Sequence, residues 1–166
     1  MQLSVKTKSG RMAYKLHLVL FLFVLTVFKS NCKELGCDRP PKYYIPNAKI
    51  DWVGAAEYCN RLNMRLAIVD SEAKHNTIVE LIKQSVANNA NRTSVWIGAN
   101  DISEEGTFVW HSTGLKVDYT NWSVGNPNNY GKEDCAEIAF QSYTNWTWTW
   151  NDHKCHTLLN FICEFR

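Results

Sequence analysis

Apolar residues recur at helical spacing in two segments of the first half of the chain. Asp51 can cap the first helix, whose periodic positions continue to Leu62. Ser71 followed by Glu72 predicts the start of a second helix, and the asparagine-rich segment 88–91 ends it. The apolar face of this second helix is expected to comprise Ile78, Leu81, Ile82 and either Ser85 or Val86.

The second half of the chain shows short runs of aromatic and β-branched residues instead. These runs predict strands at 95–97, 107–110, 136–140, 146–150 and 161–165. A long polar stretch with little periodicity separates Trp110 from Cys135, and such stretches inside a compact domain are usually functional. Because the sequence has no internal repeat and no low-complexity linker, the pattern predicts a single domain.

Composition argues for a globular domain and against two classes of function. The 166 residues suffice for one domain with a real core, and seven Trp, seven Tyr and seven Phe predict that this core is aromatic. The net charge is only +2 with both signs scattered, so no nucleic-acid partner is expected. The sequence has no nucleophile elbow, no His-Glu-x-x-His motif and no P-loop, so no catalytic activity is expected.

The N-terminal segment has the features of a targeting sequence. Residues 16–28 are almost wholly apolar and follow several basic residues, while Ser30 and Cys32 are small residues suited to cleavage by signal peptidase. The alternative is a membrane anchor, but this run is short against the ~20 residues needed to span a bilayer. We therefore expect a signal peptide at 1–32, a short arm at 33–40, a domain at 41–166 and a secreted protein without membrane insertion.

Secretion would place the cysteines in an oxidising compartment, where disulfides are expected rather than a metal site. The cysteines of the predicted domain are Cys59, Cys135, Cys155 and Cys163. They allow three connectivities; local spacing favours Cys135–Cys155, which leaves Cys59–Cys163. If cleavage follows Cys32, Cys37 is left as a free thiol or as a disulfide to a second chain, which would give a homodimer. An earlier cut would let Cys32 and Cys37 close a small local loop.

Oxygen-bearing side chains gather in the last third of the sequence. Asn126-Pro127-Asn128 is followed by Glu133-Asp134 and, after Trp150, by Asn151-Asp152. Carboxylate and amide oxygens that converge on a loop suit a hard cation such as Ca²⁺. A Ca²⁺ ion on a solvent-facing loop can also accept hydroxyl oxygens from outside. The pattern therefore predicts a binding site for polyols, above all sugars.

These motifs occur in an order that resembles the C-type lectin domain. The matching positions, in sequence order, are Cys59, 96–101, 105–108, 126–128, 133–135, 150–152, Cys155 and 161–164. The resemblance covers nearly the whole predicted domain and is to small secreted single-domain lectins of arthropods in particular. It implies an α+β fold in which two helices flank two small antiparallel sheets, with a long Ca²⁺-binding loop region and the disulfide pairing favoured above.

The resemblance also implies which residues bind the ion and the sugar. The ligands of a primary Ca²⁺ and of the carbohydrate would be Asn126, Asn128, Glu133, Asn151 and Asp152. A cis peptide bond before Pro127 would turn its two neighbours to the same side. In such sites each sugar hydroxyl binds Ca²⁺, donates a hydrogen bond to a carboxylate ligand and accepts one from an amide ligand. A possible auxiliary Ca²⁺ site would use Asp101, Glu105, Asn129 and Asp134.

The tripeptide around Pro127 departs from the two usual versions in this family. Mannose-type members usually have Glu-Pro-Asn and galactose-type members Gln-Pro-Asp, whereas this chain has Asn at both positions. With Glu133 and Asp152 as the only carboxylates, the ligand charge is −2 rather than −3, so we expect weaker Ca²⁺ binding. Asn128 keeps the donor of the mannose type, which favours mannose or fucose narrowly over galactose.

Two functions follow as hypotheses. The first is a secreted Ca²⁺-dependent lectin that recognises terminal hexose diols on glycans of microbes or cells, with a role in innate immune recognition or agglutination implied by the arthropod resemblance. The second is a scaffold of the same fold that binds a protein partner, with a weakened or absent Ca²⁺ site. Three sequons suited to N-glycosylation begin at Asn91, Asn121 and Asn145.

Overall fold

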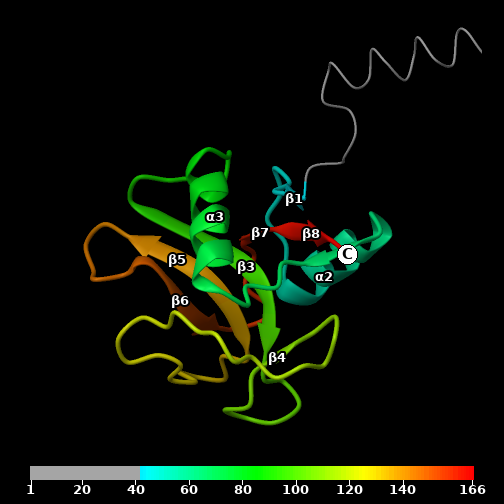
Figure 1. The fold of residues 1–166 in the computed structure, drawn as a ribbon. Coiled ribbons are helices and arrows are strands. Elements are labelled where there is room, and N and C mark those ends of the chain that lie inside the picture. Colours follow the sequence, from blue (N-terminus) through cyan, green and yellow to red (C-terminus); the bar gives the residue numbers. More distant parts are fainter. Residues whose placement is uncertain (1–41) are drawn as a thin grey trace, which may run out of the picture. The chain divides into compact units, whose positions relative to one another are not determined.

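The structure, a computed structural model, describes residues 42–166. Within this range two helices accompany a three-stranded sheet and a five-stranded sheet (Figure 1). The predicted signal peptide at 1–32 and the arm at 33–40, with Cys32 and Cys37, lie outside the described residues. These predictions, and the disulfide-linked dimer that depends on Cys37, therefore stay predictions.

Both helices begin where their capping residues predict. The helix α2 (Trp52–Arg61) starts after Asp51, whose side chain accepts a hydrogen bond from the backbone N–H of Gly54 at 2.7 Å. The helix α3 (Glu72–Lys83) starts after Ser71, whose hydroxyl accepts from the backbone N–H of Lys74 at 3.4 Å. In each case one of the otherwise unpaired N–H groups of the first turn gains a partner.

The buried face of α3 differs in part from the predicted one. It comprises His75, Ile78, Val79 and Ile82. Leu81 and Val86 are exposed. Because the helix ends at Lys83 with Gln84 as its C-cap, Ser85 and Val86 no longer follow the helical spacing on which the prediction depended.

The strands form two sheets. The order of the first is β1-β8-β2, all antiparallel, with bounds β1 (Tyr43–Tyr44), β2 (Met64–Leu66) and β8 (Cys163–Phe165). The second has the order β4-β3-β5-β6, with bounds β3 (Arg92–Asn100), β4 (Val109–Trp110), β5 (Cys135–Gln141) and β6 (Thr147–His153). A short strand, β7 (Asn160–Phe161), pairs parallel to β3, and the other strand pairs of this sheet are antiparallel. The predicted α+β fold is confirmed.

The strand predicted at 161–165 divides between the two sheets. β7 belongs to the larger sheet and β8 to the smaller one, with Ile162 between them. The N–H of Ile162 donates to the carbonyl of Trp96 at 3.3 Å, and its own carbonyl accepts from Ala67 N–H at 3.0 Å. A continuous apolar run carries no sign of such a change of partner, because both neighbours of Ile162 stay buried.

Two disulfides hold these layers together, and their pairing is the predicted one. Cys59–Cys163 joins α2 to β8 across a separation of 104 residues. Cys135–Cys155 joins the start of β5 to the segment after β6 across 20 residues. The core around them is rich in aromatic side chains, as the composition predicts, and includes the fully buried Trp96, Trp150 and Phe161.

Removal of one disulfide should lower the free energy of unfolding by a different amount than removal of the other. Chain-entropy models assign ~5 kcal/mol to a loop of about a hundred residues and ~3 kcal/mol to a loop of about twenty. The variant with Cys59→Ala and Cys163→Ala should therefore lose more free energy of unfolding than the variant with Cys135→Ala and Cys155→Ala. Chemical denaturation of both purified double variants measures this. An equal or reversed order would show that local contacts, rather than loop length, set the contribution of these bonds.

Candidate functional site

The long segment before β5 is held against β6 by backbone hydrogen bonds. Trp150 N–H donates to the carbonyl of Asn121 at 2.7 Å, and Ser123 N–H donates to the carbonyl of Trp150 at 2.8 Å. The Ser123 hydroxyl accepts from the side-chain amide of Asn126 at 2.6 Å. The peptide bond between Asn126 and Pro127 is cis, as the resemblance implies. The loop that carries the first two predicted ligands is thus fixed beside the strand that carries the last two.

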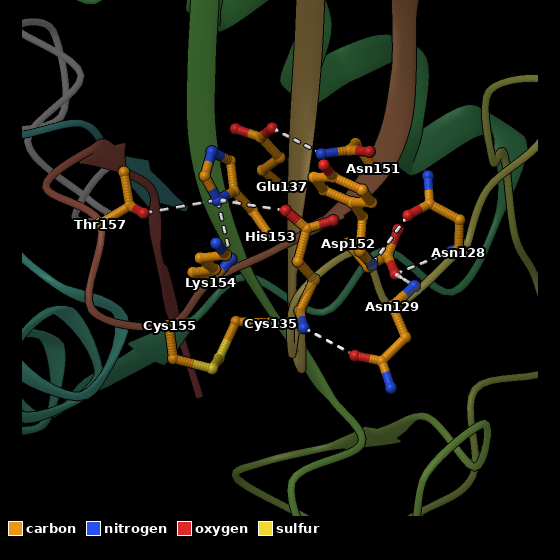
Figure 2. Close-up of polar contacts among 12 residues, drawn as sticks. Asn128, Asn129, Cys135, Glu137, Asn151, Asp152, His153, Lys154, Cys155 and Thr157 are labelled. Atoms are coloured by element: carbon orange, nitrogen blue, oxygen red, sulfur yellow. Dashed lines mark hydrogen bonds and ion pairs between the residues drawn. A yellow bond between two sulfur atoms is a disulfide. The ribbon is translucent and has the colours of Figure 1, made fainter.

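The carboxylate of Asp152 is the closest link between this loop and β6. Its Oδ2 accepts two backbone hydrogen bonds, from Asn128 N–H at 2.8 Å and from Asn129 N–H at 2.6 Å (Figure 2). Asp152 is only 1% exposed, and its Oδ1 has no hydrogen-bond partner among the described residues. A buried carboxylate oxygen of this kind needs a positively charged or donating group to offset its loss of hydration.

Glu133 lies beside Asp152 in a half-buried position. Its backbone N–H donates to the side-chain oxygen of Asn129 at 2.8 Å, and its carboxyl is 4.0 Å from Nδ1 of His153. Burial, followed by the negative charge of Asp152, raises the pKa of the Glu133 carboxyl above its ordinary value. Burial lowers the pKa of His153, whose Nδ1 already accepts from the backbone N–H of Lys154 at 2.7 Å. A lowered pKa favours the neutral ring, which supplies no positive charge to the two carboxylates.

The side chains of Asn126 and Asn128 contact each other. The amide nitrogen of Asn128 donates to the oxygen of Asn126 at 2.5 Å, while the oxygen of Asn128 accepts from Tyr130 N–H at 2.9 Å. Each amide oxygen can accept a second interaction, because it has two lone pairs. Both oxygens thus retain capacity for a cation.

Asn151 is paired with a carboxyl in the core of the sheet. Its amide nitrogen donates to Oε1 of Glu137 at 3.0 Å, and Figure 2 shows the amide oxygen on the side of the group away from Glu137. Asn151 is 5% exposed and Glu137 is fully buried. Burial raises the pKa of Glu137 to about 7, while the hydrogen bond from Asn151 acts in the opposite direction.

The four residues of the predicted auxiliary site also come together in pairs. Asp101 N–H donates to the carbonyl of Asp134 at 3.0 Å, and the side-chain amide of Asn129 donates to Glu105 at 2.5 Å. Asp101 is buried; its Oδ2 accepts from Gly106 N–H at 2.8 Å, and its Oδ1 has no partner in the described part of the chain. Burial, with further contributions from Glu105 and Asp134, raises the pKa of the Asp101 carboxyl.

These oxygens suit Ca²⁺ better than a transition metal. Between residues 42 and 166, no three His, Cys, Asp or Glu side chains gather into a metal-binding group. The primary set instead combines the carboxylates of Glu133 and Asp152 with three amide oxygens. Carboxylate and amide oxygens are the ligands of Ca²⁺, and the unpaired Oδ1 of Asp152 is placed to become one. The donor set therefore fits the ion that the resemblance implies.

Two residues that support the site were not predicted from the sequence. Ser123 is an ordinary polar residue of the loop, and nothing in its sequence neighbourhood indicates its bond to Asn126. Glu137 stands inside the apolar run of the strand predicted at 136–140, and a lone acid in such a run is the one available signal. Of the three sequons, Asn91 and Asn145 are exposed, whereas Asn121 is half-buried with its side-chain amide 3.0 Å from Nε2 of His75.

Comparison with known proteins agrees with this fold. Residues 48–165 match the family described as the lectin C-type domain. C-type lectin 16 of Aedes aegypti is 38% identical over 154 residues, which cover 92% of this chain and 99% of that protein. Salivary C-type lectin 2 of Aedes albopictus is 40% identical over 134 residues, covering 80% and 88%. The carbohydrate-recognition domain of the mouse scavenger receptor C-type lectin superposes with a TM-score of 0.62 at 28% identity, covering 78% and 94%.

The chain therefore belongs to the C-type lectin family. Proteins of this family are carbohydrate-binding and non-enzymatic, which confirms the expectation that the chain has no catalytic activity. The family generally binds Ca²⁺. In the part of the chain from residue 42 onward, no helix is long and apolar enough to cross a membrane.

Glu137 should make the stability of the Ca²⁺-free protein depend on pH. Its pKa rises from 4.5 to about 7 on folding, so the folded state binds the proton more tightly than the unfolded chain. The free energy of unfolding should then fall as pH rises from about 4.5 to about 7 and level off above. At about 1.4 kcal/mol for each pH unit of pKa difference, the fall attributable to Glu137 is at most ~3.5 kcal/mol.

Urea denaturation in EDTA across this pH range, on wild type and Glu137→Gln, measures the effect. Glu133 and Asp101 also have raised pKa values and act in the same direction, so the difference between the two proteins isolates Glu137. Parallel stability curves for the two proteins would contradict the prediction.

Proposed function

We propose that this protein is a secreted, Ca²⁺-dependent lectin that binds terminal hexose diols. The proposed ligands of both ion and sugar are Asn126, Asn128, Glu133, Asn151 and Asp152. The observation that carries the proposal is the state of Asp152, which is buried, bonded through Oδ2 to the loop and left with Oδ1 unpaired. A bound Ca²⁺ would offset the cost of that oxygen and of its neighbour Glu133.

The protein supplies too few oxygens to complete the coordination of Ca²⁺. The ion takes six to eight oxygens at about 2.3–2.6 Å, and five side chains leave room for hydroxyls of a sugar or for water. A sugar hydroxyl on the ion could donate its hydrogen bond to Glu133, one of the two carboxylates. Asn128 and Asn151 would donate to the sugar from their amide nitrogens. Each nitrogen has two hydrogens and uses one of them in a hydrogen bond within the protein.

The position of Asn126 bears on which sugar is bound. Its amide nitrogen is engaged by Ser123 and its oxygen by Asn128, so it offers a sugar hydroxyl little besides its remaining lone pair. The hydroxyl between positions 126 and 128 therefore lacks the carboxylate acceptor of the usual mannose-type site. The donor at Asn128 is retained, and this supports mannose or fucose narrowly over galactose. Asp101, Glu105, Asn129 and Asp134 would hold a second, auxiliary Ca²⁺.

The setting in which the lectin acts is also a proposal. Names of relatives that include salivary lectins support secretion, and with it a signal peptide at 1–32. Binding to glycans of microbes in innate recognition or agglutination would need two sites on one particle, which a disulfide through Cys37 would supply. We propose N-glycans at the exposed Asn91 and Asn145. Both adjoin the end of β5 at Gln141, whereas the Ca²⁺ loop adjoins its other end at Cys135.

A protein-binding scaffold remains the second candidate function. The mutual hydrogen bond of Asn126 and Asn128 and the presence of only two carboxylates in the primary set favour it, because both weaken the hold on Ca²⁺. A scaffold of this kind would bind its partner equally well in EDTA. The lectin would be released from a sugar resin by EDTA.

Replacement of Asn126 by Glu should strengthen Ca²⁺ binding. The wild-type dissociation constant is expected at about 10⁻⁴–10⁻³ M, the range of extracellular modules. Asn126→Glu adds a third carboxylate to the ligands and should lower this constant, whereas Asn47→Glu adds the same charge at an exposed residue outside the loop and should leave it unchanged. Calorimetric titration with millimolar Ca²⁺ gives all three values. No binding by correctly oxidised wild type would refute the lectin proposal, and an unchanged constant in Asn126→Glu would remove position 126 from the ligands.

The amide donors of Asn128 and Asn151 should determine which sugar the protein prefers. On a glycan array in Ca²⁺, we expect mannose- or fucose-terminated glycans to bind better than galactose-terminated ones, and all binding to vanish in EDTA. Asn128→Asp exchanges the donor for a carboxylate and should shift the preference toward galactose. Strongest binding of galactose by the wild-type protein would show that the change at position 126 outweighs the donor at Asn128.

A further inference from the structure

Glu137 is an acid with no structural reason to stay in the core. It is fully buried in β5, and among the described residues it forms no ion pair and its Oε2 has no hydrogen-bond partner. Glu164 is buried to nearly the same extent in β8, but Arg65 and Lys74 each lie 3.4 Å from its carboxylate and Ile68 N–H donates to it. The carboxyl of Glu164 is thus balanced by charge, whereas that of Glu137 is not.

The hydrogen bond that Oε1 of Glu137 accepts comes from a proposed ligand, Asn151. Glu137 and Asn151 are opposite each other in the antiparallel pairing of β5 and β6. This register places the two side chains on one face of the sheet, and the amide nitrogen of Asn151 donates to Oε1 at 3.0 Å. Asp152, whose carboxylate bonds to the loop, is the next residue along β6.

We propose that Glu137 is a positioning residue, whose carboxyl fixes the amide of Asn151 so that its oxygen is presented to the Ca²⁺ site. The inference rests on the proposed function in one respect, namely that Asn151 is a ligand. An amide turns its oxygen and nitrogen ends to opposite sides, and the two ends have opposite partial charge. Without an acceptor behind it, Asn151 can rotate and present its NH₂ group to the ion instead. Glu137 itself does not touch the ion or the sugar.

Two substitutions of Glu137 distinguish a role in positioning Asn151 from a role in the stability of the fold alone. Glu137→Gln keeps an oxygen that can accept from Asn151, and Glu137→Met keeps a side chain of similar size but removes the acceptor. Groups that orient metal ligands are typically worth about 10–100-fold in metal affinity. The Ca²⁺ dissociation constant of Glu137→Met should therefore rise about 10-fold or more, while that of Glu137→Gln should stay close to wild type.

Thermal unfolding in EDTA provides the control. Because Glu137→Met removes an unbalanced carboxyl from the core, its unfolding temperature should equal or exceed that of wild type even as its affinity for Ca²⁺ falls. A purely structural role for Glu137 would lower both quantities together, and that result would overturn the proposal. Equal loss of affinity in Glu137→Gln and Glu137→Met would overturn it as well.

Hydrogen exchange of the Asn151 side chain tests the proposal without Ca²⁺. The side-chain NH₂ of Asn151, observed by NMR in EDTA, should be protected in wild type and Glu137→Gln and exchange faster in Glu137→Met. If wild type binds no Ca²⁺, the proposed function fails, yet this measurement still decides whether Glu137 holds the amide. Unchanged exchange in Glu137→Met would show that it does not.

Discussion

The geometry of the candidate site depends on the carboxylate of Asp152. One of its oxygens accepts the backbone N–H groups of Asn128 and Asn129, so it joins β6 to the loop after the cis peptide bond. Hydrogen bonds to an ionised acceptor are among the stronger ones, and here they are buried. The same carboxylate leaves its second oxygen free for an ion. Asp152 thus fixes the loop and, at the same place, has an unpaired oxygen that suits the proposed role of a ligand.

The strands behind the loop are arranged to keep these groups in register. Cys135 and His153 are opposite each other where β5 begins and β6 ends, and the disulfide from Cys135 to Cys155 closes that end of the strand pair. Glu133 stands just before β5, and Asn151 and Asp152 stand near the end of β6. The proposed ligands, which come from distant parts of the sequence, are therefore held by one short, covalently closed section of sheet. Rigid elements of this kind fix a metal site more precisely than a loop alone.

Three buried acids of this region each have one oxygen whose lost hydration is not offset in the described part of the chain. Asp101, Glu137 and Asp152 are all buried, and each has an oxygen without a partner among the described residues. Apolar residues at these positions would pack without that cost. Natural proteins violate the rule against unpaired buried polar groups chiefly at functional sites, where the violation has a use. The concentration of three such acids around one end of the larger sheet is consistent with cation binding there.

The sequence alone determined the elements whose signals are local. The capping residues Asp51 and Ser71 and the spacing behind them predicted both helices, because a helix is stabilised by contacts three and four residues apart. The ordered motifs around Pro127 and Asp152 indicated the family and the candidate ligands. Two short strands, β1 and β2, were missed, since two or three residues leave no periodicity to detect.

Tertiary structure decided whatever depends on residues far apart. The change of sheet at Ile162 follows from hydrogen bonds to Trp96 and Ala67, neither of which is near it in sequence. The pairing of Asn151 with Glu137 depends on the register of two strands, and a shift of one residue would have separated them. The contact between Asn126 and Asn128 depends on the shape of the loop. Sequence patterns thus named the groups of the site, and only the fold determined which of their atoms are left for a ligand.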